Sequence, residues 1–203
     1  GAVFVLPASL FYFFILLVMG IAAWEWSSLA GISNTVYRAF YVTALLAAMV
    51  VSTHNASPIN LFFSMAIVCW FIALLFICLY PAAQDFWSKK MALIIVGLPL
   101  FVPGWLAFFV LRNQSNHEFH ILLLFFLVAA ADIGAYFAGR TFGKYKLAVR
   151  VSPNKTWEGF VGGVLACTLL LVITALIFSE QLPEMDLMRW FKLVIMGLVI
   201  AAF

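Results

Sequence analysis

Recurring apolar runs of about 20 residues constrain the fold of this chain more than any other feature of its sequence. A helix of that length crosses the hydrocarbon core of a bilayer and satisfies all of its own backbone polar groups. Six runs are complete, and a seventh begins near Trp190. The complete runs are Val3–Ala23, Val36–Thr53, Ile59–Tyr80, Met91–Leu111, Phe119–Gly139 and Trp157–Phe178. The pattern predicts an all-α, polytopic integral membrane helical bundle with about seven spans.

The composition agrees with a membrane protein. Of the 203 residues, 67% are hydrophobic and only 9% are charged, whereas soluble domains average about 25% charged residues. No polar, Gly-rich or Pro-rich linker divides the chain, so we expect residues 1–203 to form a single transmembrane domain. The net charge of +3 is modest and does not suggest nucleic acid as a partner.

The cations are divided unevenly between the two sides on which alternating spans would place the loops. Eight of the 11 Lys and Arg residues fall on one side. They are Arg38, Lys89, Lys90, Arg140, Lys144, Lys146, Arg150 and Lys155, against Arg112, Arg189 and Lys192 on the other side. Because cytoplasmic loops carry the excess of Lys and Arg, the basic loop 140–156 is predicted to be cytoplasmic.

The polar segment 140–163 combines these cations with glycines, which would let the backbone approach a ligand closely. Ser152 followed by Pro153 is typical of a helix N-cap and first helical position. A helix start beside Lys155 and Thr156 would offer free N–H groups, a hydroxyl and an ammonium to an anion. The alternative is that the cations only hold the loop to anionic lipid.

Two further features border this segment. Asp132 is the lone acid in its apolar run and shares a helical face with Tyr136 and Gly139. An acid within a span marks a functional site, or else pairs with a cation such as Arg140 or with a neighbouring helix. After the basic loop, Glu158 is predicted in a first helical turn, and the pair 159/163 (G-x-x-x-G) indicates close helix packing.

Three segments of the chain resemble the bacterial phosphatidate cytidylyltransferases, also called CDP-diacylglycerol synthases. Ala22–Trp26 is similar to the A-x-W-E-W segment of that family. Ala131–Ala148 is similar to D-x-G-A-Y…G-[RK]-x-F-G-K-x-K-L-A, followed by Val149 where a proline is common. Ser152–Gly159 is similar to S-P-x-K-T-W-E-G. The C-terminal family signature, with K-D, H-G-G and D-R-x-D elements, would lie beyond Phe203.

The resemblance implies transfer of the cytidylyl group of CTP to phosphatidate, giving CDP-diacylglycerol and pyrophosphate in phospholipid biosynthesis, with Mg²⁺ as cofactor. It implies catalytic roles for Asp132 and Lys155. The implied substrate-binding residues are Tyr136, Lys144, Lys146, Ser152, Thr156 and Glu158. The main metal ligands are expected beyond Phe203, with Asp132 as a candidate further ligand, so the 203-residue chain alone is expected to be inactive.

The expected partners are CTP, phosphatidate and membrane lipids in the bacterial inner membrane, and a homodimer is a candidate assembly. Two other functions fit parts of the sequence. A transporter would account for the kinked spans and the intramembrane acid, although not for the segment Ser152–Gly159. A CTP-dependent lipid-alcohol kinase is the second alternative.

The charge distribution generates a test of topology. We expect single cysteines at Tyr145 and at Glu184, in a chain without its native thiols, to react with an impermeant maleimide from opposite sides of the membrane. The cysteine at Tyr145 should be protected in intact cells and react after the membrane is opened. Its labelling from outside intact cells would contradict a cytoplasmic basic loop.

Overall fold

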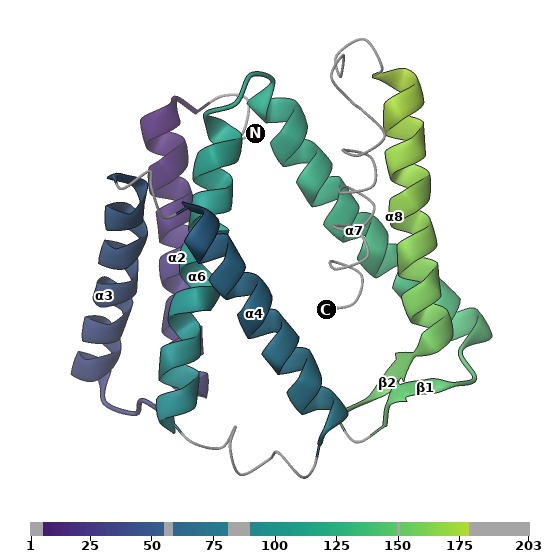
Figure 1. Ribbon diagram of the computed structural model, residues 1–203, viewed down its shortest axis with the longest axis horizontal. Coiled ribbons are helices and arrows are strands. Elements are labelled where there is room, and N and C mark those ends of the chain that lie inside the picture. The colour runs from purple at the N-terminus through teal and green to yellow at the C-terminus, as the bar shows by residue number, and fades with distance from the viewer. Residues whose placement is uncertain (1–5, 55–58, 81–89, 150, 179–203) are drawn as a thin grey trace. The chain divides into compact units, whose positions relative to one another are not determined.

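The computed structural model describes residues 6–54, 59–80, 90–149 and 151–178 (Figure 1). Its helices are α2 (Ala8–Leu29), α3 (Thr35–His54), α4 (Ile59–Cys78), α6 (Lys90–Arg112), α7 (His117–Phe142) and α8 (Trp157–Ile177), and its strands are β1 (Lys146–Ala148) and β2 (Ser152–Thr156). Within this described part, 6 helices are long and apolar enough to cross a membrane. The predicted helical membrane bundle is therefore confirmed, and the seventh span from Trp190 lies outside the described residues.

The bounds of the first helix differ most from the prediction. The apolar run predicted a helix from Val3 to Ala23. In the structure, α2 begins after its N-cap Pro7 and continues past the aromatic segment Trp24–Trp26 to Leu29. Gly31 then adopts a φ of 76°, a left-handed conformation that glycine reaches at little cost and that ends helices. Hydropathy marks the part of a helix that crosses lipid, whereas the proline and the glycine mark where the helix begins and ends.

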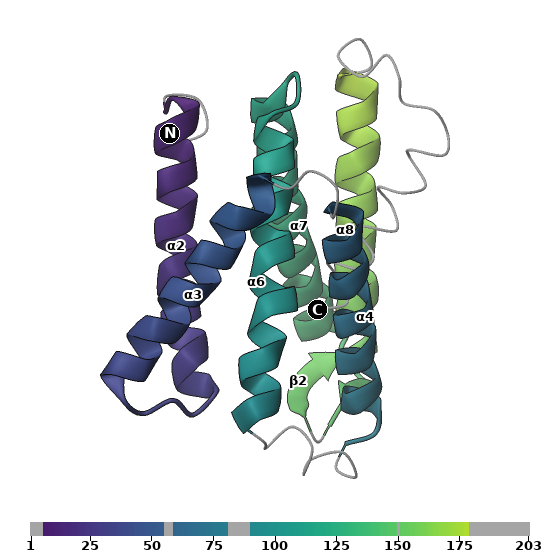
Figure 2. The same ribbon diagram turned by 60° about the vertical axis from the view of Figure 1, so that its left-hand side comes forward.

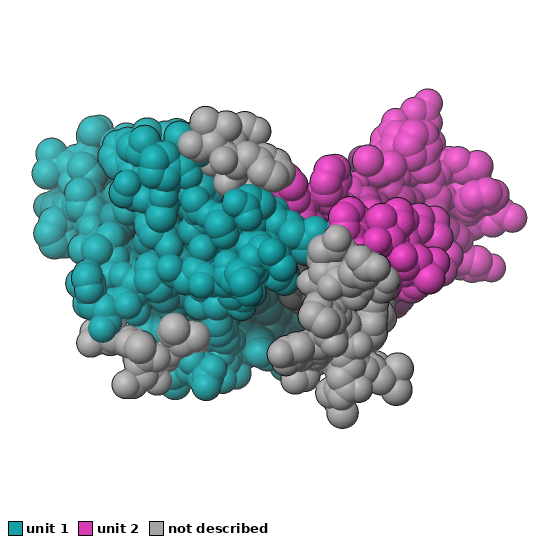
Figure 3. All heavy atoms as spheres, turned by 90° about the horizontal axis from the view of Figure 1, so that it is seen from above, with its two compact units in different colours: residues 1–121 teal, residues 122–203 magenta. Residues whose placement is uncertain are grey.

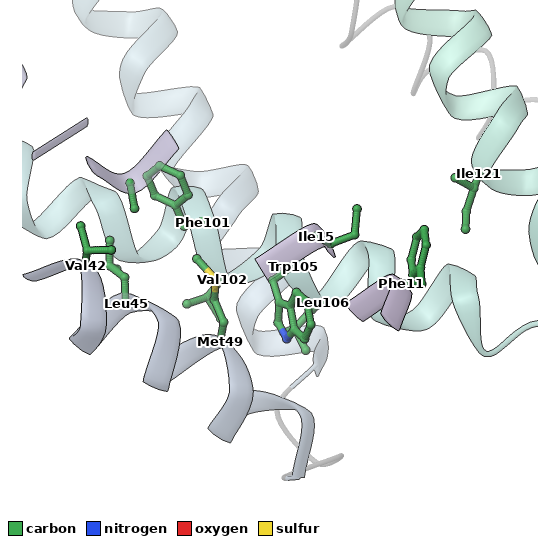
Figure 4. Packing of buried hydrophobic residues seen from close by; sticks show 11 residues of the cluster. Phe11, Ile15, Val42, Leu45, Met49, Phe101, Val102, Trp105, Leu106 and Ile121 are labelled. Atoms are coloured by element: carbon green, nitrogen blue, oxygen red, sulfur yellow. The ribbon is translucent and has the colours of Figure 1, made fainter. Parts of the chain in front are cut away.

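The chain forms two compact units, residues 1–121 and 122–203, which Figure 3 shows in teal and magenta. In the first unit, α6 packs against α2, α3 and α4, and α2 also packs against α3 (Figures 1 and 2). The buried core draws on α2, α3 and α6 (Figure 4) and includes Phe11, Ile15, Val42, Leu45, Met49, Phe101, Val102, Trp105 and Leu106. Many other apolar side chains face outward, as lipid-facing helices require.

Polar contacts tie the end of α2 to the start of α3. The Arg38 guanidinium donates from Nε to Ser27 Oγ at 3.0 Å and from Nη2 to the Trp24 carbonyl at 2.8 Å. It also lies 4.2 Å from the centroid of the Trp24 ring. Because hydrogen bonds and a cation–π contact converge on one side chain, Arg38 fixes the angle at which the two helices leave their connecting turn.

Two aromatic side chains join the first part of α6, before Pro99, to its neighbours. Trp26 Nε1 donates to the Leu93 carbonyl and the Tyr41 hydroxyl donates to the Ile94 carbonyl, each at 3.0 Å. Gly97 makes room for both donors, because a Cβ there would overlap the Tyr41 hydroxyl and lie 3.2 Å from Trp26 Nε1. A side chain at position 97 would therefore push two partly buried polar groups away from their acceptors.

We expect Gly97→Ala to destabilise the first unit by about 1–3 kcal/mol, the usual cost of overpacking a well-packed site. Gly104→Ala is the matched control, since its Cβ would meet only the flexible Met19 side chain, at 3.4 Å. Thermal unfolding of the purified protein in detergent measures the difference. Equal melting temperatures for the two variants would show that the Trp26 and Tyr41 hydrogen bonds do not require the glycine.

Candidate active site

The basic segment folds as a two-stranded antiparallel ribbon between α7 and α8 (Figure 1). Lys146 pairs with Thr156 and Ala148 pairs with Ser152, with a register shift between the two pairs. The Trp157 N–H donates to the Tyr145 carbonyl at 2.9 Å and closes the ribbon where α8 begins. The ribbon therefore holds Lys146 and Lys155 on paired strands rather than on an extended loop. Arg140 and Lys144 precede the ribbon, and Arg150 lies outside the described residues.

The predicted helix start at Ser152 and Pro153 is wrong. Both residues belong to β2, where a proline is tolerated at a position that donates no ladder hydrogen bond. Thr156 is the N-cap instead, with extended backbone angles of −128° and 154°, and its Oγ1 accepts the Gly159 N–H at 3.1 Å. Lys155 accordingly lies in the strand before the cap and not in a helical turn. Glu158 does lie in the first turn, as predicted.

Three glycines surround the capping threonine, whose side chain is only 6% exposed. A Cβ at Gly139 or Gly159 would come within 3.1 Å of Thr156 Oγ1, and one at Gly143 within 3.0 Å of its Cγ2. The prediction that these glycines leave room for a ligand therefore needs correction, because the group that approaches their backbones is Thr156. The cap locks β2, α7 and α8 together at one point.

Small residues also let α7 and α8 pack closely against each other. A Cβ at Gly162 would lie 2.7 Å from the Gly134 carbonyl oxygen and would overlap Ala138, and one at Gly159 would lie 3.0 Å from the Ala135 carbonyl. The predicted packing role of Gly159 is thus confirmed. Gly162, which the spacing argument passed over, shares that role, because positions three apart also lie on one helical face.

Glu158 fastens the turn before β1 to the start of α8. Its Oε1 and Oε2 accept the Tyr145 N–H at 3.1 and 3.3 Å. A carboxylate at this position also suits the positive end of the α8 dipole. These contacts make Glu158 a positioning group for the ribbon.

The remaining cations predicted for the site are exposed: Lys144, Lys146 and Lys155. Lys146 is the cross-strand partner of Thr156, and Lys155 precedes Thr156 on β2. The ribbon therefore places both lysines at the end that adjoins α8.

Asp132 lies exposed on α7. Among the described residues, no ion pair or side-chain hydrogen bond involves it, and Arg140 instead donates from Nη1 to the Tyr136 hydroxyl at 2.6 Å. Within the same part of the chain, no group of three or more His, Cys, Asp or Glu side chains could hold a metal ion. Asp132 itself can contribute one carboxylate to a metal ion.

A family model described as the cytidylyltransferase family matches residues 1–203. The chain belongs to the cytidylyltransferase family. Among its relatives in this family is the phosphatidate cytidylyltransferase of Pseudomonas aeruginosa, 35% identical over 164 residues that cover 81% of this chain and 60% of the relative. The phosphatidate cytidylyltransferase of Haemophilus influenzae is 36% identical over 191 residues, and the match covers 80% of this chain and 64% of the relative. The chain thus spans less than two thirds of the length of either cytidylyltransferase.

The capping contact generates a test within this family member. Thr156→Val keeps the shape of the side chain but removes the oxygen that accepts the Gly159 N–H, so we expect a loss of stability of about 1 kcal/mol. Amide hydrogen exchange at Gly159 and Phe160 should become faster. Thr156→Ser, which keeps the acceptor, is the control, and equal exchange in the two variants would mean that the cap does not hold the start of α8.

Proposed function

We propose that the full-length protein transfers the cytidylyl group of CTP to phosphatidate, forming CDP-diacylglycerol and pyrophosphate in phospholipid biosynthesis. Membership of the cytidylyltransferase family and the names of the two relatives support this reaction. The structural observation that carries it is the lysine-bearing ribbon between the ends of two apolar helices. A diacyl substrate can keep its tails in lipid there, while its phosphate meets a soluble nucleotide.

The chemistry requires phosphates to be brought together and their charge to be neutralised. An oxygen of the lipid phosphate attacks the α-phosphorus of CTP, the bond from that phosphorus to the β-phosphate oxygen breaks, and pyrophosphate leaves. Positioned cations contribute most of the catalysis in such transfers. We assign Lys155 to catalysis and Lys144 and Lys146 to phosphate binding, because all three are exposed on or beside the ribbon.

Other predicted residues take supporting parts in this proposal. Thr156 and Glu158 hold the ribbon on α8 and so position the lysines, while Ser152 and Tyr136 remain predicted substrate ligands. Mg²⁺ is the proposed cofactor and would neutralise phosphate charge when bound. Its main ligands are expected outside residues 1–203, with Asp132 as a further candidate.

We also propose that the ribbon faces the cytoplasm of a bacterial inner membrane. The excess of cations on its side of the chain and the location of soluble CTP both support this orientation. Membrane lipids are then immediate neighbours of α7 and α8. A homodimer stays a prediction from the sequence.

The deciding experiment uses membranes that contain the full-length protein, together with phosphatidate and CTP labelled at either its α- or its γ-phosphate. Cytidylyl transfer carries the α-label into lipid and releases the γ-label as pyrophosphate. A CTP-dependent lipid-alcohol kinase, offered diacylglycerol, would carry the γ-label into lipid. A transporter would incorporate neither label. Lipid labelled only from the γ-phosphate, or no labelled lipid at all, would refute the proposed reaction.

Lys155 supplies a sharper prediction. If its ammonium neutralises charge in the transition state, Lys155→Ala should lower kcat/KM about 10²–10³-fold, and Lys155→Arg should restore little of it. Simple attraction to anionic lipid is worth only about 1 kcal/mol for each cation. Lys90→Ala, at an exposed cation in the first unit, is the matched control. Near wild-type kcat/KM for Lys155→Ala would refute a catalytic role for Lys155 and would favour the alternative that the ribbon only anchors the protein to anionic lipid.

A further inference from the structure

A second cationic feature lies outside the ribbon, near the end of α7. Arg140 donates from Nη1 to the Tyr136 hydroxyl at 2.6 Å, and its guanidinium carbon is 5.8 Å from the centroid of the same ring. Phe137 packs edge-on against Tyr136, with the two ring centroids 5.5 Å apart. An exposed arginine usually samples many rotamers, whereas these contacts hold the guanidinium in one direction.

The contacts leave one edge of the guanidinium available. An arginine has five N–H donors in a planar fork, and its Nε–Nη2 edge matches two oxygens of a phosphate. Among the described residues, Tyr136 is the hydrogen-bond partner of the Arg140 side chain, through Nη1. The Nε–Nη2 edge is therefore both oriented and open to a ligand from outside this part of the chain.

The position of Arg140 along α7 indicates which phosphate it can reach. It lies in the last turn, and Tyr136 lies one turn deeper, about 6 Å along the helix axis. Ile133, Phe137 and Arg140 follow the i, i+4, i+7 spacing of one helical face. Ile133 is 57% exposed and Phe137 is 62% exposed. The guanidinium thus ends an apolar, outward-facing strip, at the level where a membrane-embedded helix meets lipid phosphates.

We propose that Arg140, oriented by Tyr136, binds the phosphomonoester headgroup of the lipid substrate, while the ribbon lysines bind CTP. The identity of that lipid as phosphatidate rests on the proposed function. The apolar strip below the guanidinium offers a surface for the acyl chains of the same molecule. Two substrates that each carry phosphate are then held by chemically different cations, a planar fork for the lipid and ammonium groups for the triphosphate.

The test compares Arg140→Gln, Arg140→Lys and Tyr136→Phe in the full-length protein, with KM measured separately for phosphatidate in mixed micelles and for CTP. We expect Arg140→Gln to raise KM for phosphatidate about tenfold or more, the value of a hydrogen-bonded charge pair, and to leave KM for CTP nearly unchanged. Arg140→Lys should resemble Arg140→Gln, because an ammonium lacks the fork. Tyr136→Phe should give a smaller rise, because the ring stays but the orienting hydroxyl is lost.

Lys90→Gln controls for general attraction between cations and anionic lipid. An equal rise in KM for phosphatidate in Lys90→Gln and Arg140→Gln would overturn the proposal, as would wild-type behaviour of Arg140→Lys. A rise confined to KM for CTP would assign Arg140 to the nucleotide and overturn it as well.

A binding measurement separates failure of this proposal from failure of the proposed reaction. Purified full-length protein is titrated with short-chain phosphatidate and, in parallel, with inorganic phosphate. Arg140-dependent binding of phosphatidate alone would support the headgroup site even if the protein formed no CDP-diacylglycerol. Equal, Arg140-dependent binding of inorganic phosphate would show a plain anion site and overturn the lipid assignment. Normal turnover and normal phosphatidate binding in Arg140→Gln would be consistent with the proposed reaction but would overturn the proposed headgroup site at Arg140.

Discussion

The second unit depends on a single buried hydroxyl. Thr156 ends β2, caps α8 and lies against glycines of both helices, so its side chain joins three elements that carry the polar residues of the site. A Cβ at any of the three glycines would lie within 3.1 Å of the threonine side chain, and one at Gly143 would also overlap the Gly139 carbonyl, so the glycines permit this close packing. Glu158 adds a second fastening one residue into the helix, through the Tyr145 N–H. Ribbon lysines attached to such a junction can be held in position, which a mobile polybasic loop cannot provide.

The first unit reaches rigidity by a different route. Three partly buried side chains of its helices donate to backbone carbonyls: Trp26 and Tyr41 donate to α6, and Arg38 donates to the Trp24 carbonyl of α2. A carbonyl already engaged within a helix can accept a second hydrogen bond through its other lone pair. Side chains can therefore link helices within an apolar bundle without disrupting the helical backbone. Two of these residues, Trp24 and Trp26, belong to a segment whose likeness to the family was visible in the sequence.

Charged groups in the second unit fall into two kinds. The Glu158 carboxylate accepts the Tyr145 N–H, and Arg140 donates to the Tyr136 hydroxyl, so each supports a particular local geometry. Lys146 and Lys155 are exposed on the two paired strands of the ribbon. Exposed ammonium groups suit a reaction between two phosphate-bearing substrates, because repulsion between the substrates has to be relieved.

Hydropathy, helical spacing and helix-terminating residues were enough to predict the membrane helices, the packing role of Gly159 and the first-turn position of Glu158, and the resemblance of three short segments predicted the family. Those features are local, because a run of apolar residues or a helical spacing has the same meaning wherever it is placed. The sequence did not determine that Ser152–Thr156 pairs with Lys146–Ala148, because Ser-Pro suits a helix start as well as an edge strand. Cross-strand pairing decided between the two. It also made Thr156 the cap, placed Lys146 opposite that cap, and directed the glycines toward a side chain. These outcomes depend on contacts between segments, and only the tertiary structure brings those segments together.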